Sequence, residues 1–324
     1  MVAAVVLAVI AVSCGGGDGD PVEVAGAGTT TDESIEATIG GATAETADDG
    51  TTEDPIVDDD PVSAPSGFEG QLTVVVPNSP GTLSVNGSQR VMTALVGDGP
   101  NAFLGSPAQP VSVRFDPVDG EGAGEVEGTW LTTNASSLGL YVAYFDFASP
   151  GLWEITVVAE GQDLGTALVE VVEDSTVPNI GDPAPPSLTA TGTTPEEIAA
   201  ISTDPEPDPA LYDLTIADAV GNGRPTVVAF ATPAFCQTAL CGPTLGMVKA
   251  ATEGRADIDV VHVEPFDLEL APGGTFEPVP TMAEWGLVTE PWVFVVDADG
   301  LVAATFEGIM GQPELEAAID RLQR

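Results

Sequence analysis

The sequence predicts a disordered N-terminal segment, then an antiparallel all-β sandwich, then an α/β domain. Three observations lead to this prediction. Residues 15–67 hold 14 acidic residues, no basic residue and almost no aromatic ones. Residues 68–173 contain about seven short runs of alternating β-forming residues separated by turn signals. Residues 211–324 alternate continuous apolar runs with helical patterns. A chain of 324 residues is long enough for two such domains and their linkers.

The charge of the chain excludes some classes of partner. Lys and Arg together number 7 against 51 Asp and Glu, for a formal net charge of −44. The first basic residue along the chain is Arg90. Nucleic-acid binding needs clustered basic residues, so nucleic acid is excluded as a partner. Docking on anionic lipid through basic patches is disfavoured for the same reason. The acidic residues are best explained as groups that keep the protein soluble.

The N-terminus predicts an export signal. Residues 2–12 are eleven consecutive apolar residues, which is too few to span a bilayer but suits the apolar core of a signal peptide. The Ala11-Val12-Ser13-Cys14 run that follows resembles a bacterial lipobox, and this resemblance implies that Cys14 is lipidated after cleavage. Because residues 1–10 contain no Lys or Arg, we expect the start codon to lie upstream. We therefore predict a signal peptide over 1–14 and a lipid-anchored protein on the extracytoplasmic face of a bacterial cell membrane.

The next two segments differ sharply in composition. Residues 15–67 bury too little apolar surface to offset their ordering entropy, which predicts an acidic disordered tether. Within 68–173, about seven strands in about 100 residues favour a sandwich of immunoglobulin type. Residues 139–147 and 150–153 are expected to form a hairpin in it. The predicted strands are 72–76, 91–96, 111–115, 128–131, 138–147, 152–159 and 166–172.

A Pro- and Thr-rich linker, 174–210, precedes the predicted α/β domain, 211–324. Thr215 can cap a short helix over 216–220. A further helix is expected to end near 253–254. The final helix, 312–324, carries Leu315, Ile319 and Leu322 on one face. Predicted strands lie at 226–231, 258–263, 292–296 and 301–306, the last two joined by a turn at 297–300.

Four segments of residues 180–324 resemble the thioredoxin-like superfamily, including membrane-anchored thioredoxin-like reductases and peroxiredoxins. They are the lead-in Ile180-Gly-Asp-Pro-Ala-Pro185, the strand before Cys236, the Glu290-Pro291-Trp292 strand start, and Gly308 with the last helix. The resemblance implies a thioredoxin-like fold whose site is the pair Cys236 and Cys241. It also implies that Pro291 is a cis-proline that pairs with the substrate backbone. Glu290 beside it would raise the pKa of a nearby thiol.

The spacing of the two cysteines departs from the family pattern, because four residues separate Cys236 from Cys241 instead of two. In a regular helix this offset places the two Cα atoms about 8–9 Å apart, too far for a disulfide. Two registers remain open: Cys236 starts the helix, or Cys241-Gly242-Pro243-Thr244 does. The second places Pro243 in the first turn, where its missing N–H costs nothing. The cysteine at the helix N-terminus is expected to have a lowered thiol pKa and to act as the nucleophile.

The remaining candidate site residues are His262 and Trp292. His262 is the single histidine of the chain and falls near the end of a predicted strand. It is expected to be a hydrogen-bonded core residue, with a third metal ligand beside two thiolates as the alternative. Trp292 is a core or rim aromatic that could support the site. Our first prediction includes no cofactor; the alternative is copper held by Cys236, Cys241 and His262.

Four functions follow from these residues. The leading prediction is thiol–disulfide exchange with protein thiols and disulfides, through Cys236 and Cys241. The second is copper binding or delivery, since the pair with His262 resembles membrane-anchored copper chaperones of cytochrome oxidase. The third is a thiol peroxidase, although the Thr and Arg that peroxiredoxins place beside their cysteine have no good match. The fourth is a non-enzymatic binding protein with a structural disulfide.

Overall fold

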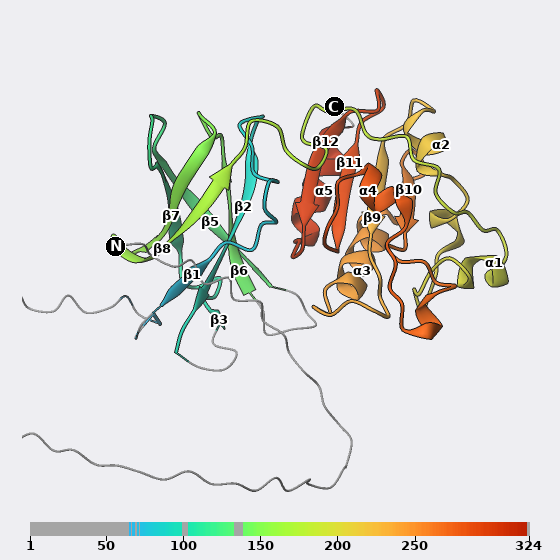
Figure 1. Cartoon of the computed structure of the whole chain (residues 1–324), viewed down its shortest axis with the longest axis horizontal. Coiled ribbons are helices and arrows are strands. Elements are labelled where there is room, and N and C mark those ends of the chain that lie inside the picture. The colour runs from blue at the N-terminus through green and yellow to red at the C-terminus, as the bar shows by residue number, and fades with distance from the viewer. Residues whose placement is uncertain are drawn as a thin grey trace, which may run out of the picture. The chain divides into compact units, whose positions relative to one another are not determined.

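The computed structural model describes residues 65, 67–68, 70, 72–98, 103–132 and 139–322 (Figure 1). All of them fall within one compact unit that spans residues 60–324. The predicted signal peptide with Cys14, and nearly all of the predicted acidic tether, lie outside the described residues. In the part of the chain that is described, no helix is long and apolar enough to cross a membrane.

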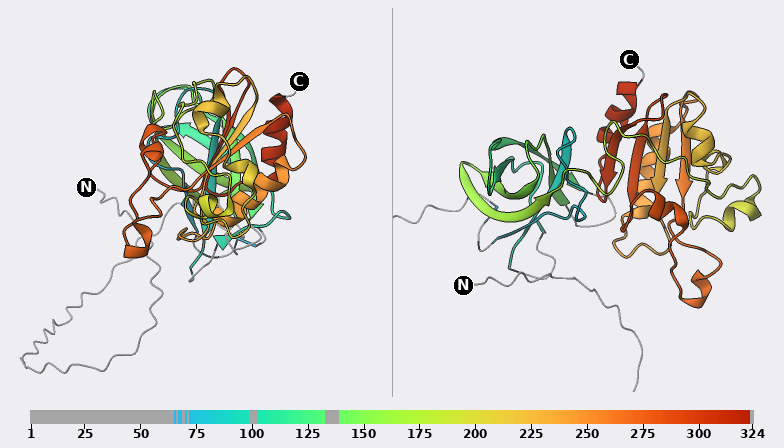
Figure 2. Two further views of the ribbon diagram at one scale, coloured as in Figure 1. Left: turned by 90° about the vertical axis from the view of Figure 1, so that its right-hand side faces the viewer. Right: turned by 45° about the horizontal axis from the view of Figure 1, so that its top comes forward.

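The first half of the described chain is a single antiparallel sheet, which we call the curled sheet. Its strands follow the order β1-β2-β6-β5-β4-β7-β8, with the short β3 paired to β2. The first and last strands of this order, β1 and β8, contact each other, so the sheet is nearly closed and barrel-like (Figure 2). The strands are β1 (Thr73–Val75), β2 (Gln89–Val96), β3 (Phe103–Leu104), β4 (Val111–Pro117), β5 (Gly124–Thr132), β6 (Gly139–Phe145), β7 (Gly151–Ala159) and β8 (Gln162–Val171).

The predicted fold class is wrong for this half, because the strands form one continuous sheet instead of a sandwich of two sheets. All seven predicted strands exist, but two of them change partner halfway. The first half of β5 pairs with β4 up to Gly128, and its second half pairs with β6 from Thr129. A Cβ at Gly128 would lie 2.8 Å from Val111 Cγ2, so the change of partner occurs where no side chain fits. Strand β2 likewise pairs with β6 and then with β1. The predicted hairpin is also wrong, since β6 pairs with β2 and β5 while β7 pairs with β4 and β8.

The second half is built on a smaller four-stranded sheet, the mixed sheet. Its order is β10-β9-β11-β12, with β9 and β10 parallel and the other pairs antiparallel. The strands are β9 (Thr226–Phe230), β10 (Asp259–Val263), β11 (Trp292–Val296) and β12 (Val302–Glu307). The helical elements are α1 (Pro195–Ala199), η1 (Pro209–Leu211), α2 (Ile216–Val220), α3 (Cys241–Thr252), η2 (Ala271–Gly273), α4 (Pro280–Glu284) and α5 (Gln312–Leu322).

The prediction of an α/β thioredoxin-like domain is wrong as well. The described chain is mostly β-sheet, and α1, α2 and α4 have only five residues each. Prolines limit helix length between β10 and β11. Pro265, Pro272, Pro278 and Pro280 fall within 16 positions of one another, and proline cannot occupy a helix interior without losing a hydrogen bond. This stretch therefore forms only η2 and α4.

Individual elements of this half agree with their sequence patterns. The strands of the mixed sheet match their predicted positions to within one residue at each end. Helix α2 is capped as expected: the Thr215 hydroxyl accepts the backbone N–H of Asp218. The turn before β12 forms with Gly300 at φ +82°, a conformation that favours glycine. The lead-in segment 180–185, within the predicted linker, hydrogen-bonds to the edge strand β12, since Gly181 N donates to Val302 O.

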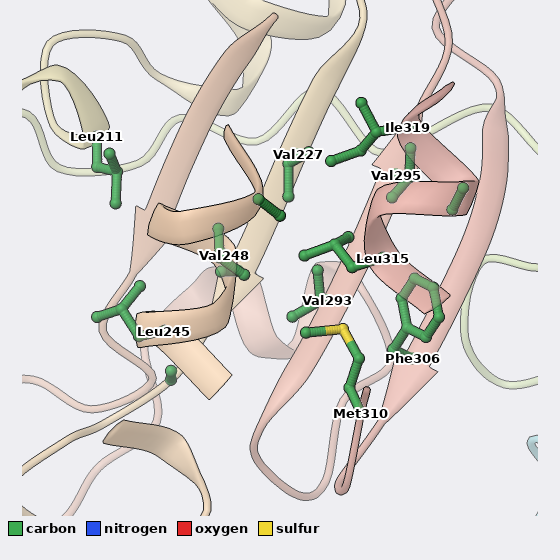
Figure 3. Close-up of a cluster of buried hydrophobic side chains, with 14 of the residues drawn as sticks. Leu211, Val227, Leu245, Val248, Val293, Val295, Phe306, Met310, Leu315 and Ile319 are labelled. Carbon is green, nitrogen blue, oxygen red and sulfur yellow. The ribbon is translucent and has the colours of Figure 1, made fainter. Parts of the chain in front are cut away.

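The mixed sheet has an apolar cluster on each face because β9 and β11 are buried on both. Val227 and Val293 face α3 and α5, where they meet Leu245 and Leu315 (Figure 3). Phe230, Trp292 and Phe294 belong to the cluster on the other face, which includes Trp285 and residues of α2 and α4. The loop that leaves β9 therefore starts from the most deeply buried strand, and the two cysteines lie in this loop and at the start of α3.

Candidate functional site

The two cysteines occupy different local structures. Cys236 lies in the loop after β9, where its backbone N–H donates to Thr232 O over 3.1 Å. The loop then turns back, with Ala239 at φ +56° and its N–H bonded to Cys236 O. Helix α3 begins at Cys241, so the structure adopts the second of the two registers. Pro243 sits in the first turn of α3, where its missing N–H has no intrahelical partner to lose.

Cys236 is a free, half-buried cysteine whose sulfur is surrounded by hydrogen-bond donors. The backbone N–H of Cys241 donates to Cys236 Sγ over 3.3 Å, and Thr238 Oγ1 lies 3.2 Å from it. The Cys241 thiol and the Leu240 N–H also bond to this sulfur. These bonds, the one from the Cys241 thiol first, lower the pKa of the Cys236 thiol to about 5. Cys236 is therefore a thiolate at neutral pH.

Cys241 has the opposite character. It is fully buried, and the pKa of its thiol is raised, first because the thiol donates to the Cys236 sulfur and then because of burial. The expectation that the cysteine at the helix N-terminus is the thiolate is thus wrong. The chain folds back so that the first N–H groups of α3 point at Cys236, and the sulfur that receives them is the stabilised one. The accessible thiolate and the buried thiol are suited to successive steps of one reaction.

Glu290 places a carboxyl group beside the pair. One carboxylate oxygen and the two sulfurs all lie within 4.8 Å of one another. The pKa of Glu290 is raised to about 7, first by burial and then by the charges of Cys236 and Glu264. The next peptide bond, Glu290–Pro291, is cis, and Pro291 O accepts the N–H of Gly308 over 2.9 Å. This loop comes directly before β11, which pairs with β9, so the sheet register brings it to the cysteines.

Among the described residues, the group that could hold a metal ion is Cys236, Cys241 and Glu290. Two thiolates suit a soft or borderline cation such as Cu⁺ or Zn²⁺, and a carboxylate is a good third ligand for zinc. His262 is not in this group. The three-residue set expected for copper, with His262 as the third ligand, is therefore not brought together.

His262 is a core residue with both ring nitrogens engaged. It is 3% exposed on β10, its Nε2 donates to Ala231 O over 2.9 Å, and its Nδ1 accepts from the Tyr212 hydroxyl over 2.9 Å. The Tyr212 hydroxyl also contacts Ser202 Oγ. Burial lowers the pKa of His262 to about 4, so the ring is neutral at physiological pH. Its partners tie β10 to the start of the cysteine loop.

Trp292 lies in the core rather than at the thiols. Its ring stacks on Phe294 with 5.7 Å between centroids, and its Nε1 donates to Thr289 Oγ1. It can support the site only by holding the strand that follows Pro291. Sequence reasoning gave no role to Leu240 and weighed Thr238 only as the threonine three residues before Cys241 in a thiol peroxidase; both residues bond to the Cys236 sulfur. Their position between the two cysteines was the available signal.

No family model and no curated protein matches this chain. Solved structures give partial likenesses. One is the thioredoxin-like protein DsbF (MTB), in its mixed oxidised and reduced forms, at 23% identity, covering 31% of this chain and 81% of that one, with a TM-score of 0.25. Another is the alkylpurine DNA glycosylase AlkC of Pseudomonas fluorescens, at 14% identity with a TM-score of 0.20, covering 32% of this chain and 31% of that one. A third is a β-glucosidase of Listeria innocua, at 13% identity with a TM-score of 0.19, covering 32% of this chain and 16% of that one. These scores are too low to define a shared fold.

Proposed function

We propose that this chain performs thiol–disulfide exchange through Cys236 and Cys241. The observation that carries the proposal is the asymmetry of the pair. One sulfur is accessible and hydrogen-bonded as a thiolate, while the second is buried, protonated and within 4.8 Å of the same carboxylate. Such a pair has a nucleophile and a resolving group already in position.

The reaction follows from the positions of the atoms. The Cys236 thiolate attacks one sulfur of a partner disulfide; a mixed disulfide forms and the other partner sulfur leaves as a thiolate, which takes a proton from solvent. Cys241 then loses its proton and attacks Cys236 Sγ. The mixed disulfide breaks, the second partner sulfur leaves, and Cys236–Cys241 is oxidised while the partner is reduced to two thiols. The same steps in reverse oxidise a dithiol.

Glu290 can accept the proton that Cys241 must lose. Its carboxylate lies beside both sulfurs, and its raised pKa of about 7 is matched to proton transfer near neutral pH. Once Cys236 is tied up in the mixed disulfide, its negative charge is gone. Burial still raises the pKa of the carboxyl, but the repulsion from Cys236 is removed, so the ionised form that can take the proton is favoured.

The test is thiol trapping with intact mass on the full chain carrying Cys14→Ser, equilibrated in dithiol redox buffers with metal chelated. Exchange predicts a two-electron transition of Cys236 and Cys241 in the range of about −270 to −120 mV that is known for exchange proteins. A pair that stays reduced throughout excludes exchange. A bridge that stays oxidised throughout assigns the pair a structural role.

We also propose that the chain acts outside the cytoplasm, anchored through lipid on Cys14. The support is the apolar segment 2–12 followed by Ser13-Cys14, and an acidic segment long enough to separate the described residues from a membrane. Expression in a bacterium and mass spectrometry of the N-terminal peptide test this. Lipid on Cys14, absent in Cys14→Ser, is expected; an unmodified, uncleaved N-terminus would contradict it.

A second candidate function is metal binding at the same site, favoured by the three donors within 4.8 Å. Anaerobic titration with Cu⁺ under competition from a chelator tests it. If the three donors bind copper, Cys241→Ser abolishes tight binding and His262→Phe leaves it intact. Equal affinity in wild type and Cys241→Ser would exclude this function.

A further inference from the structure

Two neighbouring strands of the curled sheet are buried on both faces. Residues 89–95 of β2 and 139–143 of β6 are all buried, whereas β4 alternates between buried and partly exposed residues. An antiparallel sheet with one solvated face normally alternates. Val91 and Tyr141 point to the interior of the curled sheet, where they belong to its two core clusters. Their neighbours in sequence, Met92 and Leu140, must then point outward, so the outer face of β2 and β6 is also apolar.

This outer face is covered by the second half of the chain, at the cysteine loop. Met92, Ala94, Leu140 and Val142 form one buried cluster with Leu240 and Ile309. Leu240 is only 8% exposed and directly precedes Cys241. The curled sheet therefore packs against Leu240, the residue immediately before α3.

Polar contacts fix the same two halves beside this cluster. The buried Arg90 side chain of β2 forms a salt bridge with Glu314 at 3.1 Å and donates to Ile309 O over 2.7 Å. The Tyr144 hydroxyl of β6 donates to Glu314 over 2.8 Å. A buried guanidinium with both a carboxylate and a carbonyl as acceptors defines one docked arrangement, because any shift would leave a buried charge unpaired.

Leu240 is an unusual residue at the position it occupies. It is the N-cap of α3, where Ser, Thr, Asp or Asn normally accepts a helix N–H, and it makes no side-chain cap hydrogen bond. Its backbone N–H and that of Cys241 both bond to Cys236 Sγ. The sulfur of Cys236 thus accepts the N–H groups of the N-cap and of the first residue of α3, and the leucine side chain packs the helix start into the apolar cluster.

We infer that the outer face of β2 and β6 is a positioning surface for the dithiol. By packing against Leu240 it holds the first N–H groups of α3 on the Cys236 sulfur, and so sets the reactivity of that sulfur. The inference rests on the proposed function insofar as Cys236 is the attacking thiolate. It gives the curled sheet an indirect role at the site, because the groups that bond to the sulfur, Thr238, Leu240 and Cys241, lie in the cysteine loop and at the start of α3.

The test compares the full-chain positioning variants Leu240→Ala and Met92→Ala with Val113→Ala. Val113 is fully buried inside the curled sheet, so its truncation leaves a cavity away from the cysteine loop. Two readouts are taken: the alkylation rate of Cys236 at pH 5, where the thiolate is half-formed in the wild type, and the dithiol–disulfide equilibrium against glutathione at pH 7. Circular dichroism is measured on each variant to check that it is folded.

Leu240→Ala and Met92→Ala should each displace hydrogen-bond donors from the Cys236 sulfur, and these donors stabilise the thiolate. Each variant should therefore slow alkylation of Cys236 about three- to fivefold and shift the dithiol–disulfide equilibrium about three- to tenfold toward the disulfide. Val113→Ala should leave both readouts within twofold of wild type while lowering the melting temperature. If the two positioning variants behave as Val113→Ala does, the inference is overturned. A wild-type pair that forms no disulfide would refute the proposed function, while the alkylation comparison would still decide the positioning role.

Discussion

Replacing Glu290 by Gln should make the cysteine pair a stronger oxidant, and by an amount that the structure sets. The carboxylate and the two sulfurs lie within 4.8 Å of one another. Two unit charges at that separation repel by about 1 kcal/mol in a water-like dielectric and by about 3.5 kcal/mol at an effective dielectric constant of about 20. Glu290 and Cys236 are both partly exposed, so we take about 1–2 kcal/mol.

The sign follows from which redox state carries the charge. Only the reduced form has a thiolate at Cys236, so the repulsion destabilises the dithiol and not the disulfide. Gln removes it, and the reduction potential should rise by about 20–45 mV at pH 8, given that about 30 mV corresponds to about 1.4 kcal/mol. Because the pKa of Glu290 in the reduced protein is about 7, the carboxyl is mostly protonated at pH 6 and the difference should largely disappear there.

The assay is equilibration in glutathione redox buffers at pH 6 and pH 8, with thiol trapping and mass readout. Glu253→Gln serves as the control. This substitution removes the same charge from the protein, but Glu253 is exposed at the opposite end of α3. A potential at pH 8 within about 5 mV of wild type, or a shift just as large at pH 6, would refute the electrostatic reasoning.

Three further outcomes follow from single contacts. Thr238→Val should raise the pKa of the Cys236 thiol by about 0.5–1 because a hydrogen bond to the thiolate is lost, while Thr238→Ser keeps it; thiolate absorbance against pH checks this, and equal shifts in both variants would contradict it. His262→Phe should lower the free energy of unfolding by about 1–3 kcal/mol, since Ala231 O loses its donor while the Tyr212 hydroxyl keeps only its contact with Ser202, as urea denaturation would show; an unchanged midpoint would mean that these bonds contribute nothing. Arg90→Met should lower the free energy of unfolding by about 3–5 kcal/mol in the same measurement, because the half-buried Glu314 loses its counter-charge. If Arg90→Lys restores the stability, the positive charge alone suffices.

The sequence predicted elements better than it predicted architecture. Alternation of side chains identifies a strand because successive residues point to opposite faces, and the seven predicted strands of the first half are all present. Alternation does not identify the neighbour. Gly128 could be recognised as a glycine in a strand, but not as the point where β5 leaves β4 for β6. That change of partner joins what would have been two sheets into one.

The candidate site shows the same division. The two cysteines, Glu290 and Pro291 were named from local sequence, yet the expected assignment of the thiolate to the helix N-terminus was reversed. That assignment depends on a loop that folds back far enough for the α3 amides to meet Cys236 instead of Cys241. Likewise, the spacing between Cys241 and His262 does not show that both ring nitrogens of the imidazole already form hydrogen bonds, one with Tyr212 and one with Ala231.

The sequence by itself determined which segments become strands, where α2 and α5 start, and that residues 236–241 are the candidate site, because these follow from periodicity, capping and side-chain type. Only the tertiary structure decided which sulfur is ionised, that Glu290 sits beside both, and that β2 and β6 cover Leu240. Those features depend on distances between residues far apart in the chain. Hydrogen bonding, desolvation and charge repulsion act through these distances, and the sequence pattern alone does not encode them.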